Sequence, residues 1–214
     1  MAYDLEEQEQ LATLKAWWNK YGDLVTWLLI AALAGYAAWS GWNYYQRNQA
    51  TQAALLYDEL QKAVSAKDNA RVLRAAGDMQ NKFGRTAYAQ MAALAAAKTA
   101  WESKDAAAAK AQLQWVIDNG RDAEYKALAR IRLAGVLLDE KAHDDALKVL
   151  AADMPPSFAA AAADRKGDIL AAQNKLEDAR AAWKLALDKT DEKNPARQLI
   201  QLKLDAVGGA PKAA

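Results

Sequence analysis

The chain of 214 residues contains no cysteine and a single histidine, His143. Without cysteine there can be no disulfide, thiolate nucleophile, acylated lipoprotein cysteine or thiolate metal ligand, although the compartment stays open. One histidine cannot build the usual zinc sites, and His143 falls in a predicted turn, where an ordinary surface role is expected. None of the four serines lies in a nucleophile-elbow context. We therefore predict no catalytic, cofactor-binding or metal-binding residues, and a protein that is not an enzyme.

Glycine and proline are scarce as well, with 10 and 4 residues, and no β-branched runs follow position 47. Alanine is abundant there, so the sequence favours one helix after another, each about 10 to 18 residues long. The expected breaks lie at 68–69, 83–86, 103–105, 119–120, 141–144, 155–156, 174–175 and 194–195. At the last break we expect Asn194 as N-cap and Pro195 as the first helical residue. This rhythm predicts an all-α array of helical hairpins.

A strong excess of basic charge is also missing. Residues 1–23 carry a net charge of −3, residues 24–46 carry no charge, and residues 47–214 carry +4. Spread over a domain of this size, +4 is too little for the electrostatic footprint of a nucleic-acid binder. We therefore expect no nucleic-acid partner.

What is present is an uncharged stretch of 23 residues, 24–46, in a chain of which 26% is charged. As a helix it would reach about 35 Å, enough to cross a hydrocarbon core of about 30 Å. Aromatic residues crowd both ends, as is typical of a segment with two membrane interfaces. They are Trp17, Trp18, Tyr21 and Trp27 at one end and Trp39, Trp42, Tyr44 and Tyr45 at the other. The stretch is predicted to be a single-pass transmembrane helix.

Two other interpretations of this stretch are weaker. A buried core helix would need a domain that covers all sides of a long apolar cylinder. A cleaved signal peptide would have a basic flank, whereas the preceding residues are acidic on balance. Orientation stays open, because Lys15 and Lys20 before the stretch balance Arg47 and Lys62 after it.

Residues 3–21 form a short helical candidate, with Leu11, Leu14, Trp18 and Tyr21 at helical spacing. The segment could lie at the membrane interface or be a frayed, soluble tail, and the sequence does not choose between them. Inside the span, small residues recur at four-residue spacing, which lets another helix approach closely. The possible helix-packing face consists of Ala31, Gly35, Ala38 and Gly41.

Internal similarity appears between the segments that begin at Leu133 and Lys166. Four pairs of residues match with a spacing of 33, close to the period of about 34 in tetratricopeptide repeats. The pairs are Ala134 with Gly167, Leu137 with Leu170, Ala146 with Ala179, and Leu150 with Trp183. An earlier copy places Ala97, Ala100, Ala109 and Leu113 at the same positions, and a degenerate copy is expected near 50–82. In such a repeat, small residues let the two helices of a hairpin pack closely.

The acidic tail, the aromatic-rich span, Arg132-Leu133-Ala134 and the segment from Asp164 to Trp183 together resemble the YfgM family of ancillary SecYEG translocon subunits. The resemblance implies a bacterial inner-membrane protein with a cytoplasmic N-terminus and a tetratricopeptide-like domain in the periplasm. It also implies partners, namely SecYEG and the membrane-bound chaperone PpiD, and a role in assisting secreted proteins. The family brings no catalytic motif.

The sequence thus predicts four parts: an acidic tail (1–23), a transmembrane helix (24–46), a tetratricopeptide-like domain (47–207) and a disordered C-terminal tail (208–214). A protein-interaction module at the translocon is the leading hypothesis. The same repeats could instead serve as a scaffold for envelope assembly or cell division, or as a regulatory adaptor in the cytoplasm. No motif in the sequence identifies the residues that contact partners, the client proteins or the oligomeric state.

Overall fold

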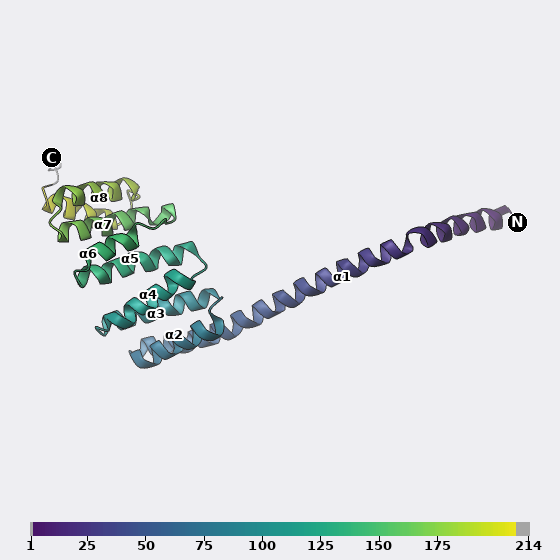
Figure 1. Ribbon diagram of the computed structural model, residues 1–214, viewed down its shortest axis with the longest axis horizontal. Coiled ribbons are helices and arrows are strands. Elements are labelled where there is room, and N and C mark those ends of the chain that lie inside the picture. Colours follow the sequence, from purple (N-terminus) through teal and green to yellow (C-terminus); the bar gives the residue numbers. More distant parts are fainter. Residues whose placement is uncertain (1, 209–214) are drawn as a thin grey trace. The chain divides into compact units, whose positions relative to one another are not determined.

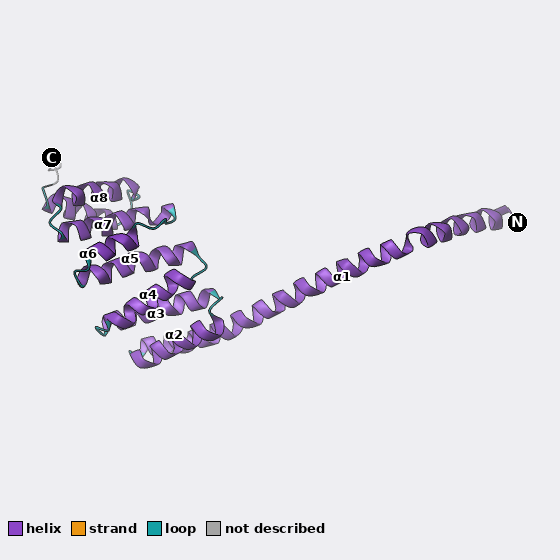
Figure 2. Ribbon diagram, in the orientation of Figure 1, coloured by secondary structure: helices purple, strands orange, loops and turns teal. Residues whose placement is uncertain are grey.

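The computed structural model describes residues 2–208, with side chains from residue 7 onward, and every regular element in this range is helical (Figure 2). The predicted all-α class is therefore confirmed. The chain divides into two compact units, Met1–Gln49 and Ala50–Ala214. Of the predicted C-terminal tail, only Gly208 falls within the described residues.

The first unit consists of the N-terminal part of α1 (Ala2–Ser65), a helix of 64 residues without a break. The helical candidate 3–21 and the predicted span are both parts of it. Residues 24–46 are all described, and none of them is buried. Within the described residues, α1 is the one helix that is long and apolar enough to cross a membrane. The exposure of residues 24–46 argues against the buried core helix considered above.

The second unit starts with the end of α1 and continues through short helices joined by short loops (Figure 1). The helices are α2 (Asn69–Phe83), α3 (Ala87–Glu102), α4 (Ala106–Asn119), α5 (Ala123–Asp139), α6 (His143–Leu150), η1 (Pro156–Phe158), α7 (Ala159–Ala172), α8 (Leu176–Lys189) and α9 (Ala196–Ala206). Each helix packs mainly on its neighbours in the sequence. The labelled helices α2 to α8 form a row in chain order, as expected of a solenoid.

Four hairpin turns share one backbone structure. Each contains one residue other than glycine with positive φ: Lys67 at 56°, Lys104 at 63°, Lys141 at 62° and Asn174 at 61°. In each turn, the next N–H donates to a carbonyl five residues earlier, at 2.8 to 3.0 Å. The carbonyls belong to Ala63, Ala100, Leu137 and Leu170. This is the Schellman arrangement that ends a helix, so the α1/α2, α3/α4, α5/α6 and α7/α8 hairpins are copies of one unit.

Two predicted boundaries are wrong by one or two residues. His143 is the first residue of α6 and is half-buried, so it does not lie in the turn. Helix α9 begins at Ala196, and Pro195 occupies the N-cap position. Asn194 still contributes to this end, because its side-chain oxygen accepts a hydrogen bond from the Ala196 N–H at 3.0 Å.

The core of the second unit is a chain of small apolar clusters. Alanine dominates the first cluster, around α1 to α3, where small side chains allow close helix packing. Larger side chains fill the last cluster, which includes Trp183, Leu187, Ile200 and Leu204. Because each cluster is shared by consecutive helices, the hairpins support one another along the row.

Candidate protein-interaction surfaces

Aromatic rings mark both ends of the apolar part of α1. Trp17 lies 5.8 Å from Tyr21 between ring centroids, and Trp42 lies 6.2 Å from Tyr45. All four side chains are exposed. From Tyr21 to Trp42 the helix rises about 31 Å, close to the thickness of a hydrocarbon core of about 30 Å. The rings are therefore spaced so that each cluster can lie at one membrane interface.

The packing face predicted in the span is exposed on the surface of α1. Ala31, Gly35, Ala38 and Gly41 lie on one side of α1, and all four are exposed. A Cβ atom added at Gly35 or Gly41 would meet nothing within 4 Å. The face is therefore accessible to another helix, and its use as a packing face stays a prediction.

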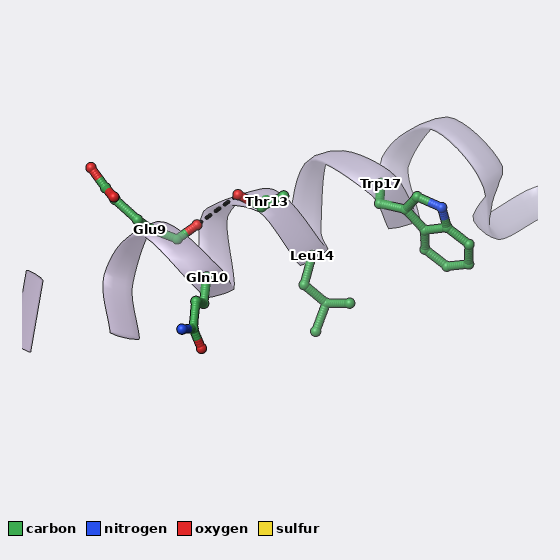
Figure 3. Close-up of a pocket in the computed structure, with 5 residues that line it drawn as sticks. All are labelled: Glu9, Gln10, Thr13, Leu14 and Trp17. Atoms are coloured by element: carbon green, nitrogen blue, oxygen red, sulfur yellow. Dashed lines mark hydrogen bonds between the residues drawn. The ribbon is translucent and has the colours of Figure 1, made fainter. Parts of the chain in front are cut away.

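A shallow hollow of about 790 Å³ lies beside the first turns of α1, lined by Glu9, Gln10, Thr13, Leu14 and Trp17 (Figure 3). All five residues come from one helix, so the hollow has no opposing wall. The Thr13 hydroxyl donates to the Glu9 carbonyl at 2.8 Å and is thus used inside the helix. This hollow is the side of an exposed helix and not a small-molecule site.

The predicted repeat residues lie at the contacts between helices. Ala134, Ala146 and Ile169 form one buried cluster, against which Leu137 and Leu150 are packed half-buried. The residues of the next hairpin form another, and they include Leu170, Ala179 and Trp183 with at most 6% exposure. Their role in packing agrees with this burial and is tested by the variants below.

Position 167 requires glycine, because the Trp183 side chain occupies the space beside it. A Cβ atom on Gly167 would collide with the indole ring, lying only 2.8 Å from its Cε2 atom. The indole Nε1–H donates to Asp168 Oδ1 at 3.3 Å, so the ring is also held by a polar contact. Helix α7 thereby approaches α8 closely at this point.

Some important residues carry no sequence signal. Gln90 is 1% exposed. Its Oε1 accepts hydrogen bonds from the N–H groups of Arg121 and Asp122 at 2.9 and 3.2 Å, and its Nε2 donates to Asp122 Oδ2 at 2.8 Å. One buried side chain on α3 thus holds the loop before α5, where Asp122 forms no side-chain cap of its own.

The last helix is attached by charged groups. Lys203 on α9 pairs with Asp164 at 2.8 Å and with Asp168 at 2.7 Å, both on α7. Arg197 donates to the carbonyls of Leu187 and Thr190 at the end of α8. These contacts hold α9 against the α7/α8 hairpin.

One face of the second unit is formed by the first helices of the hairpins. Helix α3 packs on α5, and α5 packs on α7. Met91, Lys98, Leu128, Arg132 and Arg165 lie on α3, α5 and α7 and are at least partly accessible. Arg132 is solvent-accessible, yet nearby protein atoms desolvate its guanidinium and lower its pKa from the ordinary value. We call this side the inner face.

No group of three or more His, Asp or Glu side chains is placed to hold a metal ion in the part of the chain that the structure describes.

A family model for a tetratricopeptide repeat-like domain matches residues 15–209. The ancillary SecYEG translocon subunit of Neisseria gonorrhoeae is 34% identical over 211 residues, covering 97% of this chain and 100% of the relative. The chain belongs to the family of ancillary SecYEG translocon subunits. The member from Haemophilus influenzae is 32% identical over 84% of this chain and 91% of its own length. The member from Escherichia coli K12 is 28% identical over 93% and 95%.

The resemblance to the YfgM family noted from the sequence is thereby confirmed. The match to the translocon-subunit family covers the apolar helix as well as the hairpins, because it extends over nearly the whole chain. No solved structure matches this chain significantly.

Proposed function

We propose that this protein is a membrane-anchored interaction module at the Sec translocon that assists secreted proteins in a network with a PpiD-like chaperone. The observation that carries the proposal is the full-length similarity to proteins named ancillary SecYEG translocon subunits. That similarity includes both the apolar helix and the repeat domain. The proposed location is the bacterial inner membrane, with residues 24–46 as a single span, the N-terminus in the cytoplasm and the solenoid in the periplasm.

The span would provide attachment and confinement. Its small-residue face, Ala31, Gly35, Ala38 and Gly41, has no atoms over its two glycines and can receive a translocon helix at short distance. A tethered domain also has a high effective concentration for partners in the same membrane. Weak contacts between the solenoid and an emerging chain would then suffice.

The solenoid would act by holding or recruiting proteins. Tetratricopeptide-like hairpins build extended surfaces for protein partners, and the described residues include no metal cluster. We therefore propose a non-enzymatic role, in which the domain binds partner or client chains passively.

Crosslinking from the span tests the proposal. The chain has no cysteine, so an introduced cysteine is its single thiol and its single labelling site. Ala38→Cys places a thiol-coupled photocrosslinker on the small-residue face. Leu33→Cys is the matched control, since it lies about 140° away around the helix. In native membranes we expect adducts with translocon subunits from position 38 and few from position 33.

Equal adducts from both positions would contradict a specific packing face. Absence of translocon adducts from either position, together with no translocon subunit in a mild-detergent purification, would contradict the proposed function. Adducts with envelope-assembly or division proteins instead would favour a scaffold.

A further inference from the structure

Two arginines occupy one repeat position on the inner face. Arg132 lies on α5 and Arg165 on α7, 33 residues apart, the same spacing that relates Ala134 to Gly167. Helices α5 and α7 pack on each other. Residues at equivalent positions of neighbouring hairpins line up along a solenoid, so these two side chains are neighbours in one column.

The charge of Arg165 is only partly compensated. Its Nη1 donates to Asp168 Oδ2 at 3.3 Å, and its Nε is buried without a hydrogen-bond partner. The other oxygen of Asp168 accepts from Lys203 at 2.7 Å and from the Trp183 indole at 3.3 Å. One carboxylate therefore serves three donors, and Arg165 retains unused donor capacity.

A glycine brings the two guanidinium groups to the same part of the face. A Cβ atom on Gly135 would lie 3.5 Å from Cζ of Arg165, so this guanidinium lies against α5 where that helix has no side chain. Arg132 precedes Gly135 by three residues on α5 and therefore lies beside it on the same side of the helix.

The carboxylates nearest along α5 do not neutralise the pair. Asp139 follows Gly135 by one turn and Glu124 precedes Arg132 by two turns. Within the described residues, Arg132 forms no ion pair or hydrogen bond, and Arg165 forms none with Asp139 or Glu124. The site thus has two arginines, a partly desolvated setting and no acidic partner for Arg132.

We propose that Arg132 and Arg165 bind a carboxylate of a peptide segment that lies along the inner face. Guanidinium groups present planar pairs of donors that match the two oxygens of a carboxylate. Leu128, half-buried one turn before Arg132, offers an apolar contact for the residue next to the carboxylate. The ligand class is therefore an acidic peptide with an adjacent apolar residue. The inference rests on the proposed role in protein binding but not on any particular partner.

Fluorescence anisotropy with the full chain in detergent tests this site. The probe is a fluorescein-labelled peptide with the sequence Ser-Ala-Leu-Asp-Glu and a free C-terminus. Arg132→Gln and Arg165→Gln are each expected to weaken binding at least about tenfold, because each removes a charge-assisted hydrogen bond. Arg130→Gln is the matched control on α5, since it lies about 160° around the helix from Arg132, and it should bind like the unchanged protein. Helical content by circular dichroism checks that the exposed Arg132 variant is folded.

Two further peptides identify the source of the carboxylate. Loss of binding on amidation of the C-terminus would assign the site to a chain end, and retained binding would assign it to an Asp or Glu side chain. A version with Asn and Gln in place of Asp and Glu, and with an amidated end, should not bind. Equal binding of that neutral peptide, no binding of the acidic one, or no effect of either arginine variant would overturn the inference.

The failure of this site and the failure of the proposed function are separate results. Loss of peptide binding with retained translocon adducts from position 38 would overturn only the arginine site. Peptide binding without translocon adducts would keep the site and overturn the proposed function.

Discussion

Both units of this protein are helical, but large apolar side chains are exposed in the first unit, whereas apolar side chains form a buried core in the second. In the first unit, Leu28, Leu33 and Trp39 are each more than 60% exposed. In the second unit, Ala76, Ala92 and Ala134 have no exposed surface at all. A helix with apolar residues all round requires a lipid or protein environment, whereas a helix with one apolar face requires only a neighbouring helix. The difference separates α1, the one described helix that is long and apolar enough to cross a membrane, from the helices that pack into the solenoid.

The strongest way to break this contrast is to place charge in the middle of the anchor. In the double variant Leu33→Arg/Ala34→Arg, each arginine should cost about 3 kcal/mol at the centre of a membrane helix. We expect most of the protein to leave the alkali-resistant membrane fraction. Leu55→Arg places charge at an exposed position nine residues beyond the predicted span, and this variant should remain in the membrane.

The contact between Trp183 and Gly167 should give the next largest effect. Trp183 is 3% exposed and lies over Gly167, so Trp183→Ala should leave a cavity that destabilises the last hairpins by about 3–5 kcal/mol. Urea unfolding followed by far-ultraviolet circular dichroism measures this change. Trp101→Ala removes a 40% exposed ring instead and should cost much less. Equal losses for the two variants would contradict the packing role assigned to Trp183.

A polar contact inside the alanine-rich core is the third test. Gln90→Met keeps most of the side-chain volume but removes the acceptor for the Arg121 and Asp122 N–H groups. Leaving these partly buried donors without their acceptor should destabilise the protein by about 1–2 kcal/mol. Hydrogen exchange should show faster exchange at Arg121 and Asp122 than in the unchanged protein. Unchanged exchange at both amides would show that Gln90 does not hold this loop.

The hairpin turns offer the smallest effect, and it has the opposite sign. Lys104 has φ of 63°, a conformation that glycine adopts without a Cβ penalty. Lys104→Gly should therefore raise stability by up to about 1 kcal/mol. Lys98→Gly, inside α3, should instead lower stability by about 1 kcal/mol, because glycine disfavours a helix interior. A midpoint of urea unfolding that falls in both variants would contradict the shared turn structure.

Local patterns were sufficient to predict the helices and most of the breaks. The hairpin turns near Asp68, Asp105 and Lys175 are visible because turn-forming residues interrupt alanine-rich segments. The one-residue error at Pro195 arose because a proline can occupy the N-cap as well as the first helical position. His143 was expected in the turn at 141–144, but the helix already begins there, with Asp144 and Asp145 in the first turn of α6.

Contacts between distant residues could not be predicted in this way. The bond from Gln90 to Asp122 joins residues 32 apart, and Lys203 reaches Asp164 across 39. No local periodicity distinguishes these side chains from other polar residues on helices. The column formed by Arg132 and Arg165 becomes visible only when α5 and α7 are packed side by side.

The side of the membrane that carries the solenoid is the central claim of the proposed function, and cysteine labelling measures it directly. Thr13→Cys on α1 and Ala107→Cys on α4 are single, exposed positions in a chain that has no other thiol. With a membrane-impermeant maleimide, we predict labelling of position 107 but not 13 in spheroplasts, and of 13 but not 107 in inverted vesicles. Labelling of position 107 only in inverted vesicles would place the solenoid in the cytoplasm and contradict the proposed role in assisting secreted proteins.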